Sequence, residues 1–239
     1  LVSLTTGTLN VAVGMNSGDA ITTSNSNVTI GYNAGGSITT GSNNICVGQD
    51  SGVYTTALTT GGQNTCIGHA AYTTTAGSTE ANVIGYAVGG AAGYTTLGET
   101  TNEIRTAHGS TSWATVSDER YKKDIVDSTV GLSFVNALQP RTFKYKNKGE
   151  LPDTFRAYEA DSTEVYKNSN TNHGFIAQEV KTAIDADSSI KDGFRLWDDR
   201  EDGSQEVAEA ALIPVLVKAI QELSAKNEAL LARIITLES

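Results

Sequence analysis

The sequence predicts a mainly β repeat stalk over residues 1–100, a connector at 101–116 and an α+β domain at 117–239 that ends in a coiled-coil helix over 208–238. Three observations carry this prediction. A short Asn/Gly motif recurs through the first part, and a heptad of apolar residues closes the chain. Between them the composition changes: residues 1–100 contain no Lys or Arg and hold 18 of the 24 glycines.

The recurring motif is Asn-x-x-(Val/Ile)-Gly, which begins at Asn10, Asn27, Asn44 and Asn64, with a shortened copy at Asn82. The copies end in Gly14, Gly31, Gly48, Gly68 and Gly85, at steps of 17, 17, 20 and 17 residues. Apolar and small polar residues alternate in each copy, which indicates a short strand. Glycine and asparagine beside each strand suit turns with positive φ. A fixed period predicts stacked units that cannot each bury their apolar face alone.

We expect the stalk to be a homotrimer, because one short strand per unit offers little area for a core within one chain. Three chains would then interleave or form a set of small β-rolls. Only 38% of the residues are hydrophobic and 7% aromatic, which also favours burial between subunits. A disordered Thr/Gly linker is the alternative.

Cys46 and Cys66 occupy equivalent places in two repeats. We expect small buried apolar side chains, with a disulfide as the alternative. A metal site or a nucleophile is weakly supported because no histidine stands beside them, and we expect no cofactor. The tyrosines of the repeats should pack between turns, or else bind a glycan as surface aromatics: Tyr32, Tyr54, Tyr72, Tyr86 and Tyr94.

The net charge of −10 without a basic cluster argues against a nucleic-acid or anionic-membrane partner. No apolar run approaches the ~20 residues of a membrane span, and no signal peptide opens the chain. The chain starts at Leu1 in mid-pattern, so we expect a C-terminal part of a longer protein.

The C-terminal domain mixes helices and strands. Apolar spacing predicts a short helix around 132–138, stopped by Pro140, and a second helix over 175–184. Alternation predicts strands at 142–146 and 194–197, with a polar excursion between 147 and 172.

The terminal helix carries apolar residues at steps of 3 and 4, with one polar member that would fix the register. This seam consists of Ile213, Leu216, Ile220, Leu223, Asn227, Leu230, Ile234 and Leu237. Ile at a and Leu at d alone would favour a dimer, whereas the β repeats favour a trimer. An isolated surface helix is the alternative.

Ser117 and Lys122 lie where the composition changes. A serine becomes a nucleophile when a neighbouring base takes its proton, and a lysine can be that base when burial or positive charge lowers its pKa. The spacing is an obstacle: five residues span ~16 Å in a strand and about 140° in a helix. A tight turn or another subunit would have to bring the pair together. A polar, solvated junction is the other interpretation.

Four features follow one another along the C-terminal half. They are the motif Ser117-Asp-Glu-Arg-Tyr-Lys-Lys-Asp-Ile125, the segments around Phe134, Pro140 and Phe143, the motif His173-Gly-Phe-Ile-Ala-Gln-Glu-Val180, and the heptad helix. Together they resemble the intramolecular chaperone auto-processing domain that ends endosialidase tailspikes and many phage tail fibres. The family usually has Leu where this chain has Tyr121. The Asn/Gly repeats similarly resemble trimeric adhesins and fibre shafts.

The resemblance implies a domain that trimerises, folds the fibre ahead of it as its client, and then cuts the Val116–Ser117 bond. Ser117 would be the nucleophile and Lys122 its general base. His173 and Gln178 could orient the serine or stabilise the oxyanion, or could simply support a helix start. Asp118 and Glu119 could orient Lys122 or cap a turn.

The implied setting is a virion tail fibre or spike whose chaperone part is released in the host cytoplasm. Two alternatives stay open, a permanent uncut trimer cap and a glycan- or receptor-binding fibre tip. An N-to-O acyl shift that uses Ser117 without Lys122 is an alternative route to the cut.

Overall fold

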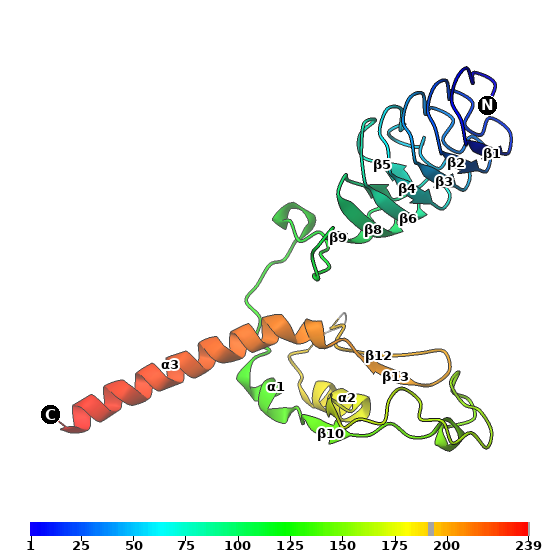
Figure 1. Ribbon diagram of the computed structural model, residues 1–239. Coiled ribbons are helices and arrows are strands. Elements are labelled where there is room, and N and C mark those ends of the chain that lie inside the picture. The colour runs from blue at the N-terminus through cyan, green and yellow to red at the C-terminus, as the bar shows by residue number, and fades with distance from the viewer. Residues whose placement is uncertain (191–193, 239) are drawn as a thin grey trace. The chain divides into compact units, whose positions relative to one another are not determined.

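The computed structural model describes residues 1–190 and 194–238, which form two compact units, Leu1–Lys123 and Asp124–Ser239 (Figure 1). The boundary between the units falls after Lys123, whereas the sequence analysis placed it after Val116. Ser117 and Lys122 therefore both belong to the first unit.

The first unit is a β-solenoid, a coil that contributes one short strand per turn to a parallel sheet (Figure 1). In stacking order the parallel strands are β1 (Val11–Val13), β2 (Val28–Ile30), β3 (Ile45–Val47), β4 (Thr65–Ile67), β6 (Asn82–Tyr86) and β8 (Tyr94–Glu99). The stack closes with β9 (Asn102–Ala107), antiparallel to β8. A second, smaller parallel pair joins β5 (Tyr72–Thr73) to β7 (Gly89–Gly90). β9 lies within residues 101–116, where the sequence pattern indicates only a connector.

A single chain closes the solenoid core. The register aligns Thr29, Cys46, Cys66 and Val83 on the inner face, where all four are buried. Ile21, Ile38 and other apolar side chains from the returning segments cover this inner face. The spacers therefore supply the layer that covers the inner face, and the stalk coils as one chain rather than by interleaving chains, one of the two arrangements expected from the sequence.

Cys46 and Cys66 are in-register neighbours on β3 and β4, and both are free thiols. The expectation of small buried apolar side chains is confirmed and the disulfide is not present. Contact with the Cys66 thiol, together with burial, raises the pKa of Cys46 well above its ordinary value.

Stacked asparagines form a hydrogen-bonded ladder inside the solenoid. The Asn44 side-chain amide donates to Asn27 Oδ1 (3.1 Å), and Asn64 donates in the same way to Asn44 Oδ1 (2.9 Å). Each oxygen also accepts the backbone N–H of the next asparagine, at 2.9 Å for Asn44 and 3.1 Å for Asn64. The ladder ends where Ala81 N donates to Asn64 Oδ1. The regular spacing of the motif thus gives hydrogen-bond partners to polar groups that would otherwise be buried without them.

Glycine is required where one turn passes over the next. Gly31 and Gly48 have φ of +128° and +123°, a region that disfavours other residues. A Cβ on Gly31 would lie 2.7 Å from the carbonyl oxygen of Gly48, and one on Gly48 would lie 2.5 Å from that of Gly68. The repeat keeps these glycines because successive turns stack backbone on backbone.

The outward face of the sheet carries an aliphatic column. The register of the strands aligns Val13, Ile30, Val47, Ile67, Ile84, Leu97 and Ile104. Several of these side chains are exposed in the single chain, for example Val13 (56%) and Ile84 (43%). Beside the column, the His69 and Tyr86 rings stack with centroids 5.2 Å apart. We call the seven residues the aliphatic column.

The second unit contains two short helices, two antiparallel strand pairs and a long helix whose start joins the core (Figure 1). Its core contains Phe134, Val180, Leu196, Leu212 and Val215. The α-helices are α1 (Leu132–Ala137), α2 (Ala177–Ala186) and α3 (Leu212–Glu238). Two single 3-10 turns, η2 (Lys148–Glu150) and η3 (Glu209–Ala211), complete the helical elements. The antiparallel pairs are β10 (Arg141–Phe143) with β11 (Asn172–Gly174), and β12 (Trp197–Asp199) with β13 (Gln205–Val207). The predicted helices are present. The strand predicted at 194–197 overlaps β12 only at Trp197, and β11 and β13 are additional to the predicted strands.

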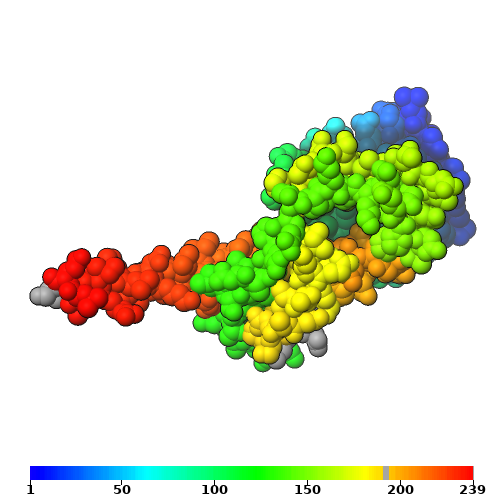
Figure 2. Space-filling view, turned by 90° about the horizontal axis from the view of Figure 1, so that it is seen from below, coloured from blue at the N-terminus to red at the C-terminus, as the bar shows by residue number. Residues whose placement is uncertain are grey.

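Helix α3 is anchored at its start and stands free towards its end, as the red rod of Figure 2 shows. Leu212, Val215 and Ala219 are buried, and α1 is its main packing partner. The Leu132 N–H at the start of α1 donates to Glu222 Oε2 (2.9 Å), so a carboxylate of α3 satisfies the N-terminus of α1. No helix of the described residues is long and apolar enough to span a bilayer.

Replacing Asn44 with alanine should destabilise the solenoid, because Asn64 N–H loses its acceptor and Gly61 O loses its donor inside the core. We expect the free energy of unfolding to fall by about 2–4 kcal/mol. Denaturant unfolding of the purified chain measures it. The matched control is Asn25→Ala, because Asn25 accepts its hydrogen bonds at an exposed position. Equal stability of the two variants would contradict a structural role for the ladder.

Candidate functional site

The candidate site lies at the C-terminal end of the solenoid. After β9 the chain turns at Gly109 and runs back along the outer edge of that strand. Arg105 and Ala114 form an antiparallel bridge in which each backbone N–H donates to the other's carbonyl at 2.8 Å. Thr115 Oγ1 donates to the carbonyl of Glu103 at 3.1 Å. These contacts hold the chain just ahead of Val116 against the last strand.

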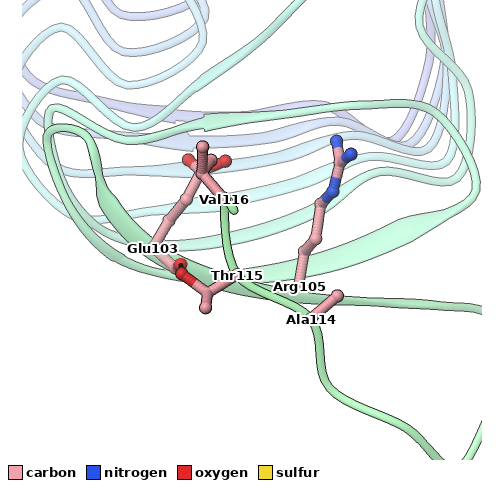
Figure 3. A pocket seen from close by; sticks show the side chains of 5 residues that line it. All are labelled: Glu103, Arg105, Ala114, Thr115 and Val116. Carbon is pink, nitrogen blue, oxygen red and sulfur yellow. Dashed lines mark hydrogen bonds between the residues drawn. The ribbon is translucent and has the colours of Figure 1, made fainter. Parts of the chain in front are cut away.

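Val116 ends this paired segment. It lines a small pocket with Glu103, Arg105, Ala114 and Thr115, and Figure 3 shows its side chain next to that of Glu103. The Val116 side chain remains exposed.

A single 3-10 turn, η1 (Glu119–Tyr121), follows Ser117 and brings Lys122 back to it. Lys122 Nζ lies 2.8 Å from Ser117 Oγ, within hydrogen-bonding distance. The turn is tighter than the strand or the helix considered from spacing, and so it removes the geometric obstacle. Both residues are exposed in the single chain.

Asp118 holds the turn together. Its carboxylate accepts the backbone N–H of Arg120 (2.9 Å) as an N-cap and also receives the Arg120 guanidinium at 2.9 and 2.6 Å. The Arg120 side chain, then its backbone N–H, and the charge of Lys122 lower the pKa of Asp118. Asp118 therefore caps the turn, one of the two roles considered from sequence. The Glu119 side chain is exposed, and its backbone carbonyl accepts the Lys122 N–H.

His173 and Gln178 belong to the second unit, whose placement relative to the first is not determined. His173 is the middle residue of β11, opposite Thr142, and Gln178 lies in the first turn of α2. Both are exposed. Next to Gln178, Glu179 accepts a two-pronged ion pair from Arg141 at 3.0 and 2.7 Å, which joins α2 to β10.

The seam residues of α3 lie on its solvent side. Ile213, Ile220 and Leu230 are 61, 66 and 54% exposed, and Asn227 is also exposed. Val217 and Leu231 add further exposed apolar surface beside the seam. The helix therefore presents a broad apolar stripe that the described residues of its own unit leave exposed.

Sequence reasoning missed two parts of the site, the pairing of Ala114 with β9 and the cap formed by Asp118 on Arg120. The second had a local signal, since an Asp two residues ahead of an Arg can accept both its N–H and its side chain. The first depends on β9, whose one strong apolar residue, Ile104, gives little alternation.

The pKa of Asp118 should rise towards its ordinary value in Arg120→Ala, because the largest cause of its lowering is then gone. Because the pKa of Asp118 is lowered in the folded chain, the cap is fully formed above the ordinary Asp pKa. The cap is lost as the pH falls through the lowered pKa of Asp118. A carbon-detected NMR titration of the Asp118 carboxyl measures the shift. Lys123→Ala is the matched control, since Lys123 is not among the groups that lower the pKa of Asp118. An unchanged pKa in Arg120→Ala would show that the guanidinium does not hold the carboxylate.

Residues 117–187 match the family model described as "Chaperone of endosialidase", whose name also designates a peptidase family. No curated protein and no solved structure shows significant similarity to the chain. The match begins at Ser117 and includes Lys122, His173 and Gln178. Residues 117–187 are therefore similar to the chaperone-of-endosialidase family, which supports an intramolecular chaperone domain of phage tail fibres in this part of the chain.

Proposed function

We propose that the chain is the C-terminal region of a phage-type tail fibre or spike, whose chaperone domain trimerises, folds the solenoid ahead of it and then cuts the Val116–Ser117 bond. The observation that carries the proposal is the 2.8 Å approach of Lys122 Nζ to Ser117 Oγ at the first residues of the family match. The fibre is client and substrate, the cut part is released in the host cytoplasm, and the remainder stays in the virion.

The proposed chemistry needs only these two side chains and water. Ser117 Oγ attacks the carbonyl carbon of Val116 while neutral Lys122 takes the hydroxyl proton. The C–N bond breaks as the leaving nitrogen takes a proton back, which leaves an ester between Val116 and Ser117. Water adds to the ester, and the products are a Val116 carboxylate and a free Ser117 amine and hydroxyl.

In this proposal, assembly makes Lys122 able to act as the base. A lysine accepts a proton only in its neutral form, and burial favours that form. Because Lys122 is exposed in the single chain, the cover must come from another unit or another subunit. His173 and Gln178 are candidates for that cover and for stabilising the oxyanion. Cleavage would then follow assembly.

Ser117→Ala should abolish cleavage, and Lys122→Ala should reduce its rate about as fully, by roughly 10³-fold or more if the pair acts as a unit. Intact mass under denaturing conditions, followed over time, measures the fragments 1–116 and 117–239. Lys123→Ala is the matched control and should be cut like the wild type.

The same measurement separates the alternatives. Both routes pass through the same Val116–Ser117 ester, which hydroxylamine would trap in either case, so the dependence on Lys122 separates them. A modest slowing in Lys122→Ala would favour an N-to-O acyl shift that does not use Lys122 as its base. A single full-length mass for the wild type would contradict the peptidase and leave a permanent trimer cap. A separate experiment, binding of the 1–116 fragment to a glycan array, would support the fibre-tip role, which is compatible with cleavage.

Two apolar surfaces support the homotrimer. One is the seam of α3 and the other is the aliphatic column of the solenoid. Residues 1–100, which hold all of the column except Ile104, carry no Lys or Arg. Burying the exposed half of each Val or Ile would contribute about 1 kcal/mol per side chain. The helices would hold the copies together at high effective concentration while the solenoids meet.

Ile84→Cys should cross-link between copies of the full chain, because equivalent column positions lie close together if the column faces the symmetry axis. A short bis-maleimide followed by a denaturing gel detects covalent dimers and trimers. Thr40→Cys is the matched control at an exposed position outside the column, and the buried native thiols leave the wild type as background. Equal cross-linking at both positions would contradict packing through the column.

A further inference from the structure

The residues on the acyl side of the proposed scissile bond are part of the solenoid sheet. The paired backbone bonds between Ala114 and Arg105 and the Thr115 hydroxyl bond to Glu103 add an extended segment to the free edge of β9. Only Val116 separates this segment from Ser117. Strand addition of this kind is a general way to hold a peptide extended and in register.

β9 itself depends on the turns before it. All six of its residues pair with β8, from Tyr94 opposite Ala107 to Glu99 opposite Asn102. The two strands approach closely at Gly98, where a Cβ would lie 2.3 Å from Asn102 O and 2.7 Å from Glu103 Cα. β8 in turn stacks on β6 as the last parallel rung. The position of Ala114 therefore requires that the end of the solenoid has folded.

The other side of the bond is fixed by a separate device. The Asp118 cap closes η1 and carries Lys122 to Ser117, all within a few residues. The approach of Lys122 to Ser117 can therefore form from local contacts alone. The position of residues 114–116 requires that β9 has joined the sheet. The two anchors leave Val116 and Ser117 as the span between them.

We propose that β9 is the positioning strand of the cleavage reaction, so that the cut can occur only after the last turns of the solenoid have formed. This inference rests on the proposed function and adds a condition to it. When β8 and β9 are unfolded, residues 114–116 lack their template and the Val116 carbonyl is not held for attack. The chaperone domain then stays attached to a fibre that is not finished.

The physical basis is orientation. A carbonyl that is displaced by about 1 Å from its reactive position can lose about 100-fold in rate. Two backbone bonds at 2.8 Å and one hydroxyl bond remove much of that freedom. A purely structural role, in which residues 114–115 only protect the edge of β9 from other strands, would not require a link to the cutting rate.

The test compares cutting rates of full-length variants by denaturing mass over time. Ala114→Pro removes the N–H that Arg105 accepts, and we expect cleavage slowed by about tenfold or more. Thr111→Pro lies in the return outside the bridge and should be cut at the wild-type rate. Thr115→Val should slow cleavage by a few-fold, and Thr115→Ser, which keeps the hydroxyl, should restore it.

A folding readout accompanies each rate. Limited proteolysis of residues 1–107 and the oligomeric state should match the wild type in Ala114→Pro and Thr115→Val, so that lost cutting cannot come from lost folding. Gly98→Val breaks the β8–β9 contact away from the bond and should also block cleavage, while the C-terminal unit keeps its oligomeric state.

The outcomes separate the inference from the proposed function. Cleavage of Ala114→Pro and Gly98→Val at the wild-type rate would overturn the role of β9 and leave the peptidase in place. Failure of the wild type to cut would overturn both. Slow cutting in Thr115→Ser as well as Thr115→Val would show that the hydroxyl bond has no part in positioning.

Discussion

Each position in the solenoid must stack on its own equivalent in the next turn, and the rest of the first unit depends on this constraint. A parallel, in-register sheet repeats every side chain at the spacing of neighbouring strands. Asparagine meets that condition in the interior because its amide donates to one neighbour and accepts from the other, as Asn27, Asn44 and Asn64 do. Glycine meets it where backbones touch, as at Gly48. The same rule aligns aliphatic side chains on the outer face, so the repeat creates an apolar surface as a by-product of its own stacking.

Much of this could be predicted from sequence, since the Asn and Gly spacings are visible in one chain. The single-chain core was predictable too, but was missed. Ile21, Ile38 and Leu58 stand alone in Thr/Ser/Gly spacers, where no local alternation marks them. Yet they step by 17 and 20 residues, the same steps as Gly31, Gly48 and Gly68. A period shared with the strands was the available signal that the spacers belong to the core.

The site was harder to predict for a different reason. The family resemblance supplies the roles of Ser117 and Lys122, but spacing alone cannot supply a turn as tight as η1. That turn depends on one carboxylate, Asp118, which accepts three donors of the same arginine. The pairing of Ala114 is non-local, because it needs β9 to have joined the sheet. His173 and Gln178 lie in the other unit, so their part in the chemistry depends on assembly.

A solenoid that closes its own core changes what a trimerising chaperone has to do. The helices are not needed to supply a missing layer, since one chain buries Ile21 and Ile38 by itself. What one chain leaves undone is the aliphatic column, which exposes Ile30, Ile67 and Ile84. On the proposed function, α3 aligns three such columns and lowers the entropy cost of their encounter. After the columns have packed and cleavage has removed the helices, three chains that separate can no longer be aligned by α3 for packing again. The persistence of the fibre is then set by the rate of opening rather than by an equilibrium with the chaperone attached.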